Sequence, residues 1–190
     1  MEALFSSTFS VFIAEIGDKT QLLTLFLAAR FAQKNAIIAG IFAATLLNHA
    51  VSAWLGVWLA GYVSHETIKW LVGGSFIAVG LWLLIPDKDE GGENARYLKY
   101  GAFAATLALF FLAEIGDKTQ VATVLLAAKY QDLAVVLIGS VLGLMLANVP
   151  VAYLGAEIVR KIPATAVRRN ACLLFCITGA LTCLGGGLSV

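Results

Sequence analysis

Two identical runs of seven residues carry most of the chemistry that this chain can perform. Each run reads Glu-Ile-Gly-Asp-Lys-Thr-Gln, once at 15–21 and once at 114–120, inside strongly apolar sequence. Carboxylate and neutral oxygens are the ligands that hard divalent cations such as Ca²⁺, Mg²⁺ and Mn²⁺ prefer. The sequence therefore predicts a cation site whose ligands are the four motif carboxylates, Glu15, Asp18, Glu114 and Asp117.

Further polar residues in and near the two motifs are candidates for a supporting role. They comprise motif residues that add counter-charge or neutral oxygens, and polar residues of two other apolar segments: Lys19, Lys118, Thr20, Thr119, Gln21, Gln120, Asn48, His49 and Asn148. An imidazole ligand at His49 would favour Mn²⁺ over Ca²⁺. A hydrogen-bonded interior histidine is an equal alternative at this position.

The charges of the two motifs do not balance. Four carboxylates and two ammonium groups give −4 + 2 = −2. One divalent cation neutralises this charge, and so do two protons, which is the charge balance of a cation/proton exchanger. In the structural alternative each lysine only pairs with an acid. That leaves one uncompensated carboxylate in each motif, a costly arrangement in an apolar interior.

The composition places these charges in a membrane protein. The chain of 190 residues is 60% hydrophobic and 13% charged, and its mean hydropathy is +0.87. A soluble domain is about a quarter charged, so the composition excludes a water-soluble globular protein. The formal net charge of +1 leaves no basic excess for binding nucleic acid, and the lipid bilayer is the expected surrounding.

Six apolar segments are long enough to cross a bilayer, for which about 20 residues are needed. They cover roughly 3–31, 36–61, 66–86, 98–128, 132–159 and 167–189, with a charged linker at 87–97. The sequence thus predicts an all-α polytopic membrane protein with six transmembrane helices.

An internal repeat organises these six segments. Residues 13–32 align with 112–131 at an offset of 99, with twelve identical residues among twenty, and the same offset makes His49 equivalent to Asn148. A unit of three spans must enter the membrane from the opposite side in its second copy. We therefore predict two inverted three-helix repeats, 1–86 and 98–190, an architecture that many secondary transporters share.

The motif segments are longer than the membrane requires. About 30 helical residues extend about 45 Å, against an apolar core of about 30 Å. Spacings of three and four residues would place Glu15, Asp18 and Lys19 on one face of a continuous helix. A tilt, an extension or a break must absorb the extra length, and the Gly-Asp steps at Gly17 and Gly116 are the expected breaks.

Lysine and arginine residues predict the orientation. Nine of them fall in the first, third and fifth connections, and only Lys69 and Lys129 fall on the opposite side. The positive-inside rule places the nine-charge side in the cytoplasm. The linker 87–97 is then cytoplasmic, and both termini lie on the non-cytoplasmic side.

Two copies of E-x-G-D-[KR]-[TS], on the first and fourth of six helices, resemble the signature of the Gdt family of membrane cation/proton exchangers. The resemblance covers essentially the whole chain. It implies transport of Mn²⁺ or Ca²⁺, with Glu15, Asp18, Glu114 and Asp117 as the cation-binding carboxylates. A chain this compact is most similar to bacterial manganese exporters, which implies a bacterial inner membrane and export in exchange for H⁺.

The predicted function is a secondary transporter that exports Mn²⁺ in exchange for H⁺, with both ions as substrates and no cofactor. A Ca²⁺/H⁺ antiporter and a passive divalent-cation channel are the alternatives, and a channel would need a continuous pore, usually from an oligomer. The sequence leaves a homo-oligomer open. An enzyme is not expected, because acid–base catalysis needs two groups of different acidity and the four carboxylates are symmetric.

Overall fold

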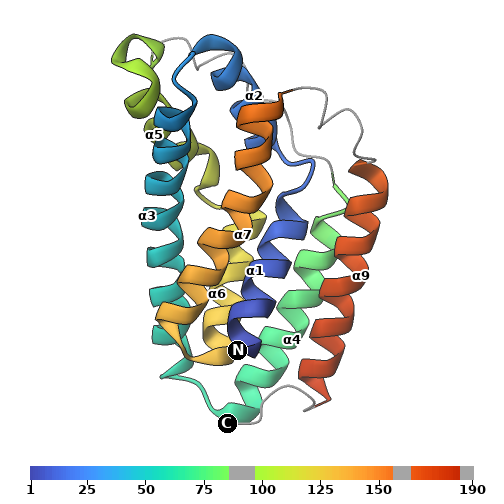
Figure 1. The fold of residues 1–190 in the computed structure, drawn as a ribbon. Coiled ribbons are helices and arrows are strands. Elements are labelled where there is room, and N and C mark those ends of the chain that lie inside the picture. Colours follow the sequence, from blue (N-terminus) through green and yellow to red (C-terminus); the bar gives the residue numbers. More distant parts are fainter. Residues whose placement is uncertain (86–96, 156–163, 185–190) are drawn as a thin grey trace.

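The computed structural model describes residues 1–85, 97–155 and 164–184, and every regular element within these ranges is helical. The elements form an elongated bundle (Figure 1). In chain order they are α1 (Glu2–Glu15), α2 (Lys19–Arg30), α3 (Lys34–Ala60), α4 (His65–Trp82), η2 (Leu98–Tyr100), α5 (Gly101–Glu114), α6 (Lys118–Tyr130), α7 (Leu133–Leu154) and α9 (Ala164–Cys183). The predicted all-α fold is confirmed, and residues 87–96 of the predicted linker lie outside the described part.

Several helices have the length and composition of membrane spans. Among the described residues, α3 and α7 are each long and apolar enough to cross a bilayer alone. The stretch 98–130 adds a third span if η2, α5 and α6 are counted together, although it bends by 69°. Shorter apolar helices lie at Lys69–Trp82 and Arg169–Cys183. The structure is thus an apolar helical bundle, and its six-span topology stays a prediction.

Both motif segments are broken at the Gly-Asp step, as expected. The first helix ends at Glu15, Gly17 has φ 78°, and the chain resumes as a helix at Lys19. In the second motif Gly116 has φ 72° between α5 and α6. Positive φ is strained for residues with a side chain, so glycine is what lets the chain turn here.

The break corrects one expectation drawn from residue spacing. Glu15, Asp18 and Lys19 do not share one face of a helix, because Glu15 ends α1 and Lys19 begins α2. Asp18 and Asp117 instead hold the N-cap positions of α2 and α6. The motif residues therefore belong to two helix ends in each half of the chain.

The two halves of the chain interlock. Helix α1 packs against α7, and α5 packs against α3, which is the same contact with the halves exchanged. Glycines permit these close approaches: Gly40 of α3 faces Thr106, and the equivalent Gly139 of α7 faces Ser7, in both cases too closely for a Cβ atom. Helices α4 and α9 form a further pair.

The bundle is apolar outside and partly polar inside. Large apolar side chains are exposed along the outer faces of several helices, among them Leu47, Val51, Trp54, Leu146, Leu173 and Ile177. Buried side chains, by contrast, include many polar and charged ones. This distribution suits a protein surrounded by lipid, where polar side chains turn toward the protein interior.

The helices alternate in direction along the bundle. One end of the bundle, uppermost in Figure 1, holds the last residues of α2 and the first residues of α3, η2 and α9. The start of α1 and the ends of α3, α6 and α9 lie at the other. Consequently Arg30, Lys34, Lys99 and Arg169 gather toward the same end of the bundle, whereas Lys69 and Lys129 lie toward the opposite end.

Candidate metal-binding site

The four motif carboxylates are buried in the bundle. Glu15 and Glu114 are 0% exposed, Asp18 is 5% exposed and Asp117 is 3% exposed. Three of them, Glu15, Asp18 and Asp117, each offer one carboxylate oxygen, and these three oxygens lie within 4.8 Å of one another. Ligand oxygens on opposite sides of a Ca²⁺ ion are about 4.6–5.2 Å apart, which is twice the bond length. The spacing of these three oxygens is therefore compatible with one ion between them.

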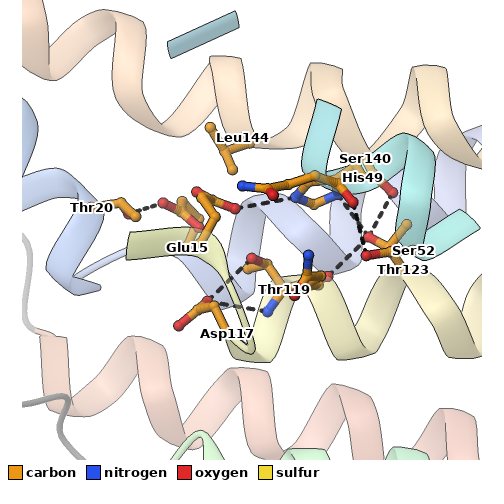
Figure 2. A network of polar contacts seen from close by, with 12 residues as sticks. Glu15, Thr20, His49, Ser52, Asp117, Thr119, Thr123, Ser140 and Leu144 are labelled. Carbon is orange, nitrogen blue, oxygen red and sulfur yellow. Dashed lines mark hydrogen bonds and ion pairs between the residues drawn. The ribbon is translucent and has the colours of Figure 1, made fainter. Parts of the chain in front are cut away.

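Glu114 lies beside this group of three. Its charge acts on Glu15, and the charge of Asp117 acts on both glutamates. Figure 2 shows the polar network that surrounds Glu15, Asp117 and His49. The structure thus brings all four predicted carboxylates into one buried acidic cluster, with Glu114 at its edge toward His49.

The two motif lysines lie in different surroundings. The Lys19 Nζ atom is 3.3 Å from Asp117 Oδ1, so the lysine of one motif pairs with an acid of the other. The Lys118 Nζ atom donates a hydrogen bond of 3.0 Å to the backbone oxygen of Ile85, beyond the end of α4, and lies over the ring of Trp82. The pairing of Lys19 across the halves means that the motif charges are shared between them.

Glu15 is held by two neutral donors. The Thr20 hydroxyl donates to Glu15 Oε1, and the amide nitrogen of Asn148 donates to the same oxygen at 3.1 Å. Asn148 belongs to α7 of the other half, and its Oδ1 atom accepts a hydrogen bond from Thr24 at 2.8 Å. The first glutamate is thus positioned by a Thr24–Asn148 pair.

Glu114 is contacted by His49, at the position equivalent to Asn148, whereas Thr119, equivalent to Thr20, bonds Asp117 instead. The Nε2 atom of His49 lies 3.3 Å from Glu114 Oε2, and Nδ1 lies 2.9 Å from the Thr123 hydroxyl. Both His49 and Glu114 are 0% exposed. At the offset of 99, His49 replaces Asn148 and Thr123 corresponds to Thr24. The site therefore has approximate two-fold symmetry, but an imidazole contacts Glu114 and an amide contacts Glu15.

Thr24 and Thr123 did not figure among the predicted site residues. Each is fully buried and bonds the residue that holds a glutamate. Ser140 adds a further hydroxyl 3.1 Å from Thr123. The repeat contains the signal that reveals the two threonines, because they are identical residues at the offset of 99 just after the motif.

The remaining predicted supporting residues mainly stabilise the backbone. The oxygens of Gln21 and Gln120 accept hydrogen bonds from the N–H groups of Gly17 and Gly116, at 2.9 and 2.7 Å, and so brace the two breaks. Asn48 donates to the Phe111 oxygen at 3.0 Å and links α3 to α5. Direct metal coordination by either glutamine or by Asn48 stays a prediction.

Thr119 supports one of the aspartates directly. Its hydroxyl donates to Asp117 Oδ2 at 3.2 Å, and its backbone N–H contacts the same oxygen at 3.3 Å. Asp117 thereby caps α6 and points one oxygen toward Lys19. Contacts from both halves of the chain, with Lys19 of α2 and Thr119 of α6, therefore fix the orientation of the Asp117 carboxylate.

Some carboxylate oxygens of the cluster have no hydrogen-bond partner. They include Glu15 Oε2 and Glu114 Oε1, both buried. A buried polar atom without a partner costs about 1–3 kcal/mol, and more if it is charged. Coordination of a cation, or protonation of each glutamate, would satisfy these oxygens, so the arrangement is suited to a site that is loaded in turn by a cation or by protons.

A small pocket lies beside Asp18, near the end of α4. It is lined by Asp18 and Lys118, and otherwise by Gly17 and apolar residues: Ile13, Ala14, Ile16, Leu83 and Ala171. Leu83 lies just beyond α4, on the side where α4 ends. The two charged residues of this wall, Asp18 and Lys118, come from different motifs.

Apolar helices that break where they carry buried carboxylates are typical of membrane transporters for cations, and comparison with known proteins agrees with this class. A family model described as divalent cation/proton antiporter GDT1 matches residues 3–91 and 102–188. The chain therefore belongs to the GDT1 family, which confirms the resemblance drawn from the two motifs. This family is a family of transporters and not of enzymes.

Two of the relatives named here cover nearly the whole chain, and a third covers three quarters of it. A Vibrio cholerae serotype O1 protein named "Putative manganese exporter" is 47% identical over 183 residues, which are 96% of this chain and 90% of the relative. GDT1-like protein 5 of Arabidopsis thaliana is 24% identical over 216 residues, or 94% of each chain. GDT1-like protein 3 of Oryza sativa subsp. indica is 26% identical over 167 residues, with 75% of this chain and 59% of the relative covered. No solved structure matches the chain.

Proposed function

We propose that this GDT1-family antiporter exports Mn²⁺ from the bacterial cytoplasm in exchange for protons. The observation that carries the proposal is the buried cluster of Glu15, Asp18, Glu114 and Asp117, in which oxygens of both glutamates lack a hydrogen-bond partner. Its net charge of −2 with both motif lysines suits one divalent cation or two protons. The name of the Vibrio cholerae relative supports manganese as the cargo.

The four carboxylates would act as ligands of the transported ion. Three of them already place oxygens within 4.8 Å of one another, and the breaks at Gly17 and Gly116 bring helix ends to the site. Lys19 occupies one side of Asp117. We expect the arriving metal to take over Asp117 from this ammonium group, because both compete for the same carboxylate.

Transport in proteoliposomes tests this proposal. With an acidic interior and the membrane potential clamped, protons leaving through the protein should drive external Mn²⁺ inward above its outside concentration. Collapse of the pH gradient with an ionophore should stop this accumulation, because no other energy source is present. Entry that only equalises the two concentrations would instead indicate the passive channel, and faster accumulation of Ca²⁺ than of Mn²⁺ would indicate the calcium antiporter.

We further propose that the chain spans the inner membrane six times as two inverted repeats. The exchanged contacts of α1 with α7 and α5 with α3 support a two-fold relation between the halves, and so do the two separate matches to the family model. The basic end of the bundle would face the cytoplasm.

Accessibility labelling measures this topology. Single cysteines introduced in a cysteine-free variant should react from the cytoplasm at residues 87–96 and from outside near residue 2 and near residue 188. Such labelling is informative in intact cells and in inverted vesicles, which expose opposite faces. Labelling of the two termini from opposite faces would exclude an even number of spans and, with it, the inverted repeat.

A further inference from the structure

The two halves of the site carry different residues at the equivalent positions 49 and 148, and this difference has a chemical consequence. Asn148 presents an amide nitrogen to Glu15, and His49 presents the ring nitrogen Nε2 to Glu114. An amide nitrogen only donates a hydrogen bond, whereas Nε2 of a neutral imidazole is either an N–H donor or a lone pair, depending on the tautomer. Only the half that contains Glu114 can therefore offer nitrogen to a metal.

We infer that His49 is the residue that makes the site select Mn²⁺ over Ca²⁺, by adding Nε2 as a ligand next to Glu114. The inference rests on the proposed transport function and names the specificity determinant of that same site. Calcium takes oxygen ligands, while imidazole nitrogen suits first-row transition metals. An all-oxygen cluster would leave the two ions poorly distinguished.

The surroundings of His49 allow the tautomer that coordination needs. Thr123 lies 2.9 Å from Nδ1, and its hydroxyl has two other partners, the Thr119 backbone oxygen at 2.9 Å and the Ser140 hydroxyl at 3.1 Å. When the Thr123 hydroxyl donates to the Thr119 oxygen, it accepts the proton of Nδ1. The Nε2 lone pair then faces the acidic cluster (Figure 2).

The geometry at Glu114 is consistent with a shared ion. His49 Nε2 and Glu114 Oε2 are 3.3 Å apart, and the other oxygen of Glu114 is buried without a hydrogen-bond partner. Both side chains are fully buried, so the imidazole meets Glu114 inside the bundle. Ser140, which steadies Thr123, is replaced by Ile41 in the other half, where the amide needs no such support.

Electron spin-echo spectroscopy of Mn²⁺ bound to the purified protein tests the inference directly. A coordinated imidazole couples ¹⁴N to the Mn²⁺ spin, so the wild-type protein should show ¹⁴N modulation. His49→Asn, which gives the first half the residue of the second, should abolish that modulation. The Mn²⁺ dissociation constant should rise at least about tenfold, and that of Ca²⁺ should change less than about twofold because calcium does not use the nitrogen.

The reciprocal exchange is the matched control. The double variant His49→Asn/Asn148→His moves the imidazole to the equivalent position, and we expect it to regain ¹⁴N modulation and preference for Mn²⁺. A wild-type protein that binds Mn²⁺ without ¹⁴N modulation overturns the role of His49, whether or not the variants fold, and leaves the transport proposal standing. A wild-type protein that binds neither Mn²⁺ nor Ca²⁺ overturns both.

Discussion

Replacement of Glu15 by Gln, or of Asp117 by Asn, is expected to reduce Mn²⁺ transport to the rate of liposomes without protein. Each change keeps the size of the side chain but removes one charge, so the net charge of the site falls from −2 to −1. The site then no longer neutralises a divalent ion, and an uncompensated charge in an apolar surrounding is costly. Uptake of Mn²⁺ under a pH gradient measures the effect.

Glu66→Gln serves as the matched control for these variants. Glu66 lies in the exposed first turn of α4, away from the cluster, and its neutralisation should leave transport at the wild-type rate. Comparable thermal unfolding of all variants in detergent would show that the loss is specific to the site. Near-normal transport by the four single variants Glu15→Gln, Asp18→Asn, Glu114→Gln and Asp117→Asn would refute the assignment.

Binding of Mn²⁺ should release protons, with two expected where the empty site is doubly protonated. Carboxylates must be deprotonated to act as ligands, so metal binding and proton loss are coupled. Affinity for Mn²⁺ should therefore rise with pH while these protons leave, and become constant once the cluster is fully ionised. Because the carboxylates act on one another, the protons should leave in steps that belong to the cluster and not to single residues.

Calorimetry in two buffers of different ionisation enthalpy counts these protons. The difference between the two heats of binding, divided by the difference in buffer enthalpy, gives the number released for each Mn²⁺ bound. Lys19→Gln offers a useful comparison, because it removes the ammonium group beside Asp117 without removing a carboxylate. Proton release near zero from about pH 5 to pH 9 would contradict exchange and favour the channel.

Much of this site was predictable because charged residues in apolar sequence have few acceptable explanations. The repeated motif identified the four carboxylates, and the glycines within it predicted the break that Gly17 and Gly116 provide. The repeat also made His49 and Asn148 equivalent before any contact was known. These inferences depend only on the local sequence and on its duplication, and the way in which the helices pack does not change either of them.

The partners of the site residues were not predictable in the same way. Spacing along the chain suggested that Lys19 shares a helical face with Glu15, whereas the structure pairs it with Asp117 of the other motif. Which of the two glutamates His49 contacts likewise depends on how α3 packs against α5 and α6. Contacts of this kind arise from the interlocking of the two halves, and the spacing of residues within one half contains no information about it.

The interlocked packing also sets an order in which the protein can be completed during synthesis. His49 precedes Glu114 in the chain, so the second glutamate meets its partner as soon as it is made. Glu15 must wait for Asn148, which follows it by 133 positions. A chain that ends before α7 offers Glu15 only the hydroxyl of Thr20 among the hydrogen-bond donors seen in the structure. Such an intermediate keeps a poorly satisfied acid in an apolar helix, at a cost of a few kcal/mol, so we expect the first half to gain stability when α7 packs against it.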